Sequence, residues 1–370
     1  MRLMNTVSPP VFSPLLLRLF PVLFLHLMVP LLALGGIGIT AAPAAAGTLL
    51  VANKSDATLS LLSFPGGRRV GLVPTGEGPQ EIAVSLDGDR ALVTNYGSSE
   101  RPGNTLTLVD VASAQAVATI TLPEGAKPHG IEWLDDRRAV VTAEGLGALL
   151  IVDVDEGKVL QRINTEQDVS HMVVVTPDRR LAFVSNTGSG SVSVIDLPNA
   201  KLLEILPTGQ GAQGIALASN GSQLWITNGA GDTVSIIGMA DRSVSANLQT
   251  PGFPVRAEHD TRRGRMYIAL PAADAMAAFA TASRERTHYV EFDLPAQGDP
   301  QTAATESKVD SSFPMGMQIA EEHSLLFVAH TAASVISAWD TRALKHVGYY
   351  RAGLEPDGMG WSQLDVAVQR

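Results

Sequence analysis

Residues 181–196 read LAFVSNTGSGSVSVID: an apolar stretch ending in Val-Ser-Asn, a short loop, and a stretch that alternates small polar with aliphatic residues. An alternation with a period of two, rich in β-branched residues, indicates a half-buried β-strand and not a helix. The segment therefore predicts two consecutive strands joined by a tight, glycine-containing loop.

The same unit recurs about every 42 residues from Thr48 to the C-terminus, which makes seven copies. The first strand of each copy ends at an equivalent residue: Asn53, Asn95, Ala143, Asn186, Asn228, Leu270 and His330. A repeat of this length with four short strands is typical of a β-propeller. The sequence thus predicts an all-β, seven-bladed β-propeller of four-stranded blades.

The two ends of the repeat array predict how the ring closes. The first copy begins at Thr48 without a preceding inner strand, whereas residues 356–361 at the C-terminus form an inner-strand motif with no partner. We therefore expect the C-terminal segment to complete the first blade. Such closure removes an open sheet edge that would otherwise invite pairing with another chain.

Three of the repeat segments resemble the YVTN family of seven-bladed propellers: RALVTN at 90–95, SVSVID at 191–196 and GIAL at 214–217. The resemblance covers the chain after Gly47 and is specific for the fold. It implies kinship with propellers found beside quinoprotein dehydrogenases and with propellers related to the haem domain of nitrite reductase. The matching residues build blades, so the resemblance implies no particular reaction.

The first 46 residues have the composition of a secretory leader. Residues 15–39 are almost wholly apolar, two arginines lie near the front, and Ala44–Ala46 form a small-residue cleavage motif. This predicts a signal peptide over 1–46, cleavage between Ala46 and Gly47, and a single propeller domain over 47–370. We expect a periplasmic or secreted protein without stable membrane insertion. An uncleaved membrane anchor is the alternative, because the apolar stretch is long.

Cysteine content and charge narrow the chemistry further. The chain has no cysteine, which excludes disulfides, thiolate metal sites, a lipoprotein anchor and covalent c-type haem attachment. Without the two leader arginines, 25 basic and 37 acidic residues remain, a net charge of about −12. Nucleic acids and anionic membranes both favour a basic face. The expected partner is therefore a small-molecule ligand or a periplasmic protein, bound by a monomer.

The loops at one end of a propeller gather around its central channel, where ligands favour the opening. Five of the seven predicted inner strands begin with a charged or imidazole group, and the strand ends add Glu144 and His330. The candidate ligand-binding residues at this mouth are Glu81, His129, His171, Arg256, His330 and Asp357. Histidines and carboxylates together suit a divalent metal or an acid–base pair, so His129 and His171 are the candidate metal ligands.

A structural reading of the same residues stays open. Polar groups at a channel mouth are often only solvated, and Arg256 could tie neighbouring blades together. The Asn residues at the strand ends are expected to cap loop backbone. Two segments, 96–104 and 295–312, depart from the repeat on the face of the histidines. Such insertions often mark a binding side, although loop drift explains them equally well.

Three functions are compatible with these residues. We favour a non-catalytic scaffold that binds a ligand or partner at the mouth, since the chain shows no Walker loop, zinc signature or nucleophile elbow. A metal- or cofactor-binding propeller, an accessory of a haem or quinone pathway, is the second, with the cofactor unknown. The third is implied by a resemblance in strand pattern to seven-bladed lactonases. In that hydrolase Glu81, His171 and Arg256 would act at the channel.

Overall fold

The computed structural model describes residues 47–218, 221–294 and 311–367. The predicted leader and its cleavage site, Asn220 and most of the polar loop 295–312 lie outside these described residues. Within the described ranges, no helix is long and apolar enough to cross a membrane.

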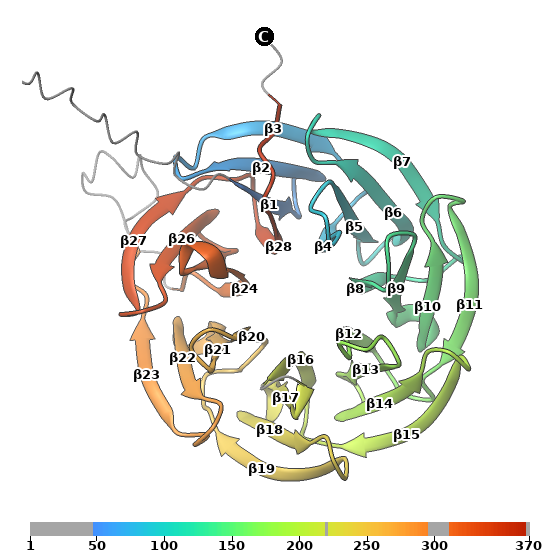
Figure 1. Cartoon of the computed structure of the whole chain (residues 1–370), viewed down its shortest axis with the longest axis vertical. Helices are drawn as coiled ribbons and strands as arrows, with labels where there is room; N and C mark the ends of the chain where they lie inside the picture. The colour runs from blue at the N-terminus through green and yellow to red at the C-terminus, as the bar shows by residue number, and fades with distance from the viewer. Residues whose placement is uncertain (1–46, 219–220, 295–310, 368–370) are drawn as a thin grey trace, which may run out of the picture. The chain divides into compact units, whose positions relative to one another are not determined.

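Seven sheets of four antiparallel strands surround a central axis, which confirms the predicted seven-bladed propeller (Figure 1). The strands nearest the axis are β4 (Pro79–Val84), β8 (Pro128–Trp133), β12 (Ser170–Val175), β16 (Ala212–Ala218), β20 (Arg256–Asp260), β24 (Pro314–Ala320) and β28 (Pro356–Ser362). The second strands are β1 (Gly47–Asn53), β5 (Arg90–Gly97), β9 (Arg138–Ala143), β13 (Leu181–Asn186), β17 (Gln223–Asn228), β21 (Arg265–Leu270) and β25 (Leu325–His330).

The remaining two strands of each blade lie progressively farther from the axis. The third strands are β2 (Thr58–Phe64), β6 (Pro102–Asp110), β10 (Ala148–Asp153), β14 (Ser191–Asp196), β18 (Thr233–Gly238), β22 (Ala275–Ala280) and β26 (Val335–Asp340). The outer strands are β3 (Arg69–Pro74), β7 (Gln115–Thr121), β11 (Lys158–Asn164), β15 (Lys201–Pro207), β19 (Ser243–Gln249), β23 (Arg286–Glu291) and β27 (Lys345–Tyr350).

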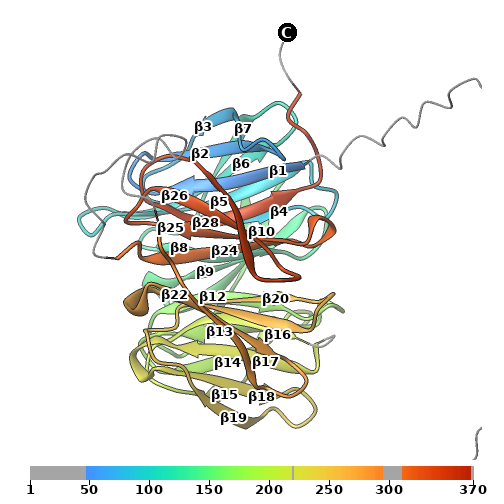
Figure 2. The same cartoon turned by 90° about the vertical axis from the view of Figure 1, so that its left-hand side faces the viewer.

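The first blade is built from both ends of the repeat array, as predicted. Strand β28 pairs antiparallel with β1, so that Leu49 lies opposite Trp361 and Val51 opposite Met359. The four strands of this blade follow the order β28-β1-β2-β3. Figure 2 shows the last strand of the chain among the blue strands of the first blade. The ring is therefore closed by backbone hydrogen bonds.

The hydrophobic core lies between neighbouring blades. The described residues form seven apolar clusters, and each cluster is shared by two adjacent blades. Leu92 and Val141 join blades 2 and 3, for example, and Phe327 and Leu62 join the last blade to the first. The second and third strands are buried on both faces, so the half-buried strand predicted for residues 191–196 from their alternation is wrong: Ser191 and Ser193 are buried together with the aliphatic residues. The outer strands alternate more, since one of their faces meets solvent.

Glycines allow the inner strands to approach one another near the axis. A Cβ added to Gly358 would lie 2.0 Å from the carbonyl oxygen of Gln80, on the next inner strand. At Gly316 the corresponding distance, to the carbonyl oxygen of Asp357, would be 1.9 Å. No side chain fits at either distance, which explains why the repeat places glycine here.

Buried asparagines tie the second strand of a blade to its third strand. The Asn186 amide nitrogen donates to the hydroxyls of Ser191 and Ser193, at 3.2 and 3.0 Å. Asn53, Asn95 and Asn228 make the same pair of bonds in their own blades. These bonds satisfy buried polar groups inside the blade. The expected contact with loop backbone is present at Asn53, whose side-chain oxygen accepts from the Gly353 N–H.

His330 occupies the asparagine position of the seventh blade, and its predicted place at the channel mouth is wrong. It is fully buried, with its ring nitrogens 2.7 Å from the hydroxyls of Ser312 and Ser337. The ring also packs edge-on against Phe292. The last residue of this strand directs its side chain into the blade, so a histidine there ties strands together and does not face the axis.

The inner-strand glycines can be tested by substitution. Gly358→Ala should lower the free energy of unfolding by about 1–3 kcal/mol, the usual cost of overpacking. Gly348→Ala on β27 is the matched control, because nothing lies within 4 Å of its added Cβ; it should change stability by less than about 0.5 kcal/mol. Urea unfolding of the three proteins decides, and equal stability of the two variants would contradict the close approach.

Burial lowers the pKa of His330 to about 3. We therefore expect the stability of the protein to depend on pH through this residue. In the unfolded chain this histidine has an ordinary pKa near 6.5. Between about pH 6.5 and 3 it is therefore protonated in the unfolded chain but neutral in the folded chain. Stability should therefore fall as the pH falls through this window. His330→Asn, which mimics the other blades, should lose this component of the acid sensitivity. Urea unfolding at pH 7 and 4.5 measures it; parallel pH dependences in the two proteins would refute the assignment.

Candidate ligand site at the channel mouth

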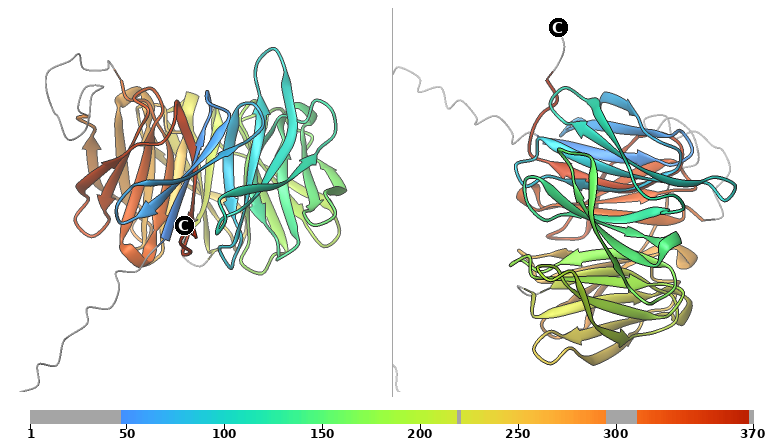
Figure 3. Two further views of the ribbon diagram at one scale, coloured as in Figure 1. Left: turned by 90° about the horizontal axis from the view of Figure 1, so that it is seen from above. Right: turned by 90° about the vertical axis from the view of Figure 1, so that its right-hand side faces the viewer.

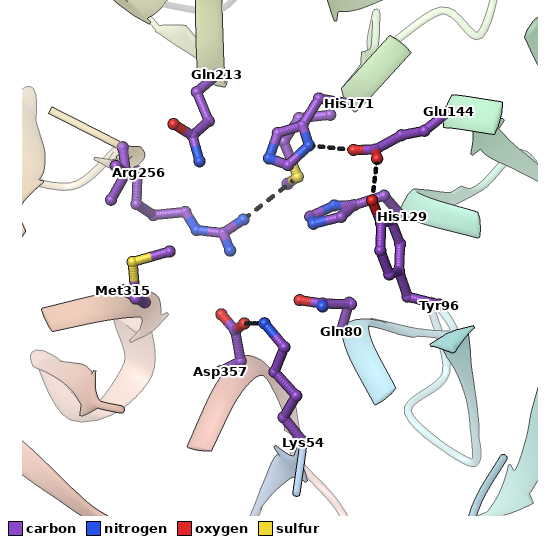
Figure 4. A pocket seen from close by; sticks show the side chains of 12 residues that line it. Lys54, Gln80, Tyr96, His129, Glu144, His171, Gln213, Arg256, Met315 and Asp357 are labelled. Carbon is purple, nitrogen blue, oxygen red and sulfur yellow. Dashed lines mark hydrogen bonds and ion pairs between the residues drawn. The ribbon is translucent and has the colours of Figure 1, made fainter. Parts of the chain in front are cut away.

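Side chains from the start of all seven inner strands converge on one cavity of about 250 Å³. They occupy equivalent repeat positions and are Gln80, His129, His171, Gln213, Arg256, Met315 and Asp357 (Figure 4). The ring brings this position to the axis once per blade, so residues far apart in sequence share one site. Five residue types occupy these seven positions, and this variety makes the site asymmetric.

A second set of lining residues comes from the ends of the second strands of blades 1 to 3, directly after the strand in β1 and β9 and just inside it in β5. These residues are Lys54, Tyr96 and Glu144. Tyr96 belongs to the predicted insertion, which the structure forms as an extension of the β5–β6 hairpin on the mouth face (Figure 3). Its backbone N–H donates to the Gly78 carbonyl at 3.0 Å. The insertion thus places an aromatic hydroxyl beside the histidines.

An ion pair across the channel forms the floor of the cavity. The Arg256 guanidinium reaches from β20 to β4 and lies 2.5 Å from the Glu81 carboxylate, with both side chains largely buried. The other terminal nitrogen of Arg256 lies 3.5 Å from the Met172 sulfur. Burial raises the pKa of Glu81, while the facing Arg256 charge lowers it. Arg256 therefore ties distant blades together and borders the cavity at the same time.

Lys54 and Asp357 form a second charged pair, which lines another part of the cavity. The Lys54 ammonium lies 3.6 Å from the Asp357 carboxylate, whose side chain is almost fully buried. The Gln80 amide bridges them when its nitrogen donates to Asp357 at 2.9 Å and its oxygen accepts from Lys54 at 3.1 Å. This pair is also near the ring closure, since Asp357 belongs to β28 and Lys54 follows β1.

The remaining wall is a connected cluster of Tyr96, Glu144, His171 and His129 (Figure 4). The Tyr96 hydroxyl donates to one oxygen of Glu144 at 2.6 Å, and the other oxygen of Glu144 lies 2.5 Å from His171 Nδ1. The His171 and His129 rings stand side by side, with centroids 3.8 Å apart. Tyr96 meets His129 edge-on.

Burial shifts the pKa values of His129 and Tyr96 in this cluster. Desolvation lowers the pKa of His129 well below its usual value, and the nearby His171 and Arg256 charges lower it further. His129 is thus neutral, and its Nδ1 is a buried atom without a hydrogen-bond partner among the described residues. Desolvation, with the adjacent Glu144 carboxylate, raises the pKa of Tyr96, so this phenol remains a hydrogen-bond donor.

The structure brings four of the six predicted residues to the cavity: His129, His171, Arg256 and Asp357. Glu81 lies beneath them, bonded to Arg256, and His330 lies inside its blade. Sequence reasoning placed Glu144 at a strand end but missed its contact with His171. It placed Gln80, Gln213 and Met315 at the starts of inner strands without proposing them as ligand-binding residues, and it did not propose Lys54, Tyr96 or Met172. The repeat could have revealed two of these residues from the sequence. Lys54 follows Asn53 and Tyr96 follows Asn95, just as Glu144 follows Ala143 at the equivalent position.

Comparison with solved structures supports the fold alone. A chain of hydrazine synthase from Kuenenia stuttgartiensis is similar, with a TM-score of 0.65 and 16% sequence identity over 80% of this chain and 93% of the other. No protein with curated annotation matches the sequence.

One protein-family sequence model does match, over residues 135–357, and its description is "Cytochrome D1 heme domain". The match begins in blade 3 and reaches the start of the closing strand, β28, at Asp357. It spans more than half of the 370 residues. The chain therefore belongs to the cytochrome D1 heme domain family.

Proposed function

We propose that this propeller is a binding scaffold that holds a small polar ligand in the cavity at the channel mouth. The observation that carries the proposal is the convergence of seven equivalent side chains on one cavity that the Arg256–Glu81 pair closes from below. A concave site with a few converging polar groups is the usual form of a small-molecule site. Binding in such a site requires no catalytic group.

The lining favours a ligand rich in hydrogen-bond acceptors, such as a small organic acid. Gln213 points into the cavity toward Arg256 (Figure 4). Among the described residues, the Arg256 nitrogen that does not face Glu81 has only the weak acceptor sulfur of Met172 as a hydrogen-bond partner. A carboxylate placed between Gln213 and Arg256 would receive charge-assisted hydrogen bonds, the stronger kind.

The family description names a heme, and the described residues do not fit a group of that size. The cavity of about 250 Å³ is below the roughly 300–1,000 Å³ of ordinary ligand pockets, and a tetrapyrrole is a large ligand. The rings of His129 and His171 stand 3.8 Å apart, which leaves no room for a macrocycle between them.

A lactonase-like hydrolase agrees less well with this geometry. In such a hydrolase Arg256 would polarise a carbonyl and His171 or Glu81 would act as base, yet Arg256 and Glu81 form an ion pair with each other. His171 has Glu144 as its carboxylate partner. Catalysis by these residues would first require the Glu81–Arg256 pair to separate. The scaffold function requires no such rearrangement.

Several finer points remain part of the proposal. We propose that the repeat is of the YVTN type, that the chain is exported behind a cleaved leader to the periplasm or the medium, and that it acts as a monomer. A periplasmic protein docking on the mouth face is the other partner class. The acidic composition supports both partner classes over nucleic acid.

A binding panel tests the scaffold function. Small mono- and dicarboxylic acids, hydroxy acids and sugar acids are titrated by calorimetry into the wild-type protein and Gln213→Leu. An acid that binds the wild type should bind Gln213→Leu about 10-fold or more weakly, since a hydrogen bond to a charged group contributes about 1.5–3 kcal/mol. Gln161→Leu, an exposed change on the outer strand β11, is the matched control. Equal binding by both variants would place the ligand elsewhere, and turnover of a bound acid would show an enzyme.

A further inference from the structure

We propose that His129, His171 and Glu144 bind one divalent first-row transition-metal ion at the wall of the mouth cavity. Each residue offers one ligand atom, and these atoms all lie within 4.8 Å of one another. This inference rests on the proposed function in one respect, because the ion would bind the acid group of the ligand in the same cavity. Its own binding does not require that ligand.

The spacing of the three ligand atoms is near that of an occupied site. Donor atoms lie about 2.0–2.2 Å from zinc and therefore about 3.4 Å from each other. Rotations of the three side chains would have to open the 2.5 Å contact between Glu144 and His171 Nδ1 and shorten the separations that are longer than this. The residues start from rigid parts of the fold: His129 on β8, His171 on β12 and Glu144 on the turn that follows β9.

The state of His129 points to a missing partner. The side chain is only 8% exposed, yet its Nδ1 has no hydrogen-bond partner among the described residues. Buried polar atoms are rarely left unpaired without a functional reason.

Tyr96 holds the carboxylate ligand in place. Its hydroxyl donates to one oxygen of Glu144, and the other oxygen then faces His171 Nδ1 at 2.5 Å. The ion would take the position of the hydrogen in this contact. His171 would bind through Nδ1 as the tautomer that carries its proton on Nε2, so the ring itself stays neutral. Outer partners of this kind orient metal ligands and raise affinity.

Nearby positive charges do not prevent a cation from binding here. Arg256 is paired with Glu81, and Lys54 with Asp357. The Lys127 ammonium lies over the Tyr96 ring, 4.5 Å from its centroid. Glu144 supplies the negative charge at the site.

The ligand set selects the class of ion. Two imidazoles and one carboxylate suit zinc, iron(II) or cobalt(II), whereas calcium and magnesium prefer oxygen ligands alone. Three protein ligands leave coordination positions open on the cavity side. A carboxylate of the bound acid would fill one of them.

Cobalt(II) chloride is the probe that tests this inference. The protein is freed of metal with a chelator and titrated while its visible absorption is recorded, with zinc chloride as the competitor. We expect one cobalt per chain, and a loss of affinity of more than about 100-fold in His129→Ala and in Glu144→Gln, beyond the effect of outer-sphere changes. His288→Ala, on the outer strand β23, should bind as the wild type does.

Tyr96→Phe keeps the test decisive if a ligand variant fails to fold. It removes one hydroxyl and should weaken cobalt binding about 10- to 100-fold. No cobalt band in the wild type, or unchanged affinity in Tyr96→Phe and a folded ligand variant, would overturn the metal site. Acid binding by a protein that binds no cobalt would remove this inference and leave the proposed function. Cobalt binding by a protein that binds none of the acids would support the metal site and remove the proposed function.

Discussion

The pairing of β28 with β1 is the constraint on which the rest of the structure depends. Each blade buries both of its faces against a neighbour, so an open array would leave one apolar face of the first and last blades in water. The closing strand provides the missing partner, and its Met359 and Trp361 pack in the apolar cluster between the last blade and the first. It also brings Asp357 to Lys54 and Gln80. Closure of the ring and completion of the cavity are therefore one event.

The same ring geometry separates structural from chemical positions within each repeat. Residues that face a neighbouring blade are apolar, and the strand-end asparagines bond hydroxyls inside their own blade. Most of the described residues that line the cavity lie at the start of an inner strand or next to the end of a second strand. These two positions can vary without loss of the fold. Family membership therefore describes the blades well and the contents of the cavity poorly.

Charge in the mouth is arranged as pairs. Arg256 with Glu81 and Lys54 with Asp357 neutralise each other across blades, which limits the cost of burying ions near the axis. The cluster of Tyr96, Glu144, His171 and His129 differs, because a neutral histidine ends it with an unused nitrogen. This unmatched atom is the chemical feature of the cavity that blade packing does not explain.

The sequence by itself determined the blade number, the strand pattern and the ring closure, because these follow from local alternation and a regular repeat. It also placed His129, His171, Arg256 and Asp357 at one mouth, since equivalent repeat positions must meet at the axis. Only the tertiary structure decided which of these side chains touch. Glu144 reaches His171 from the neighbouring blade, and Tyr96 reaches Glu144 from the blade before it. His330 turns into its own blade, as its strand-end position requires. Side-chain direction and contact between blades arise when the ring closes, so no pattern within one repeat encodes them.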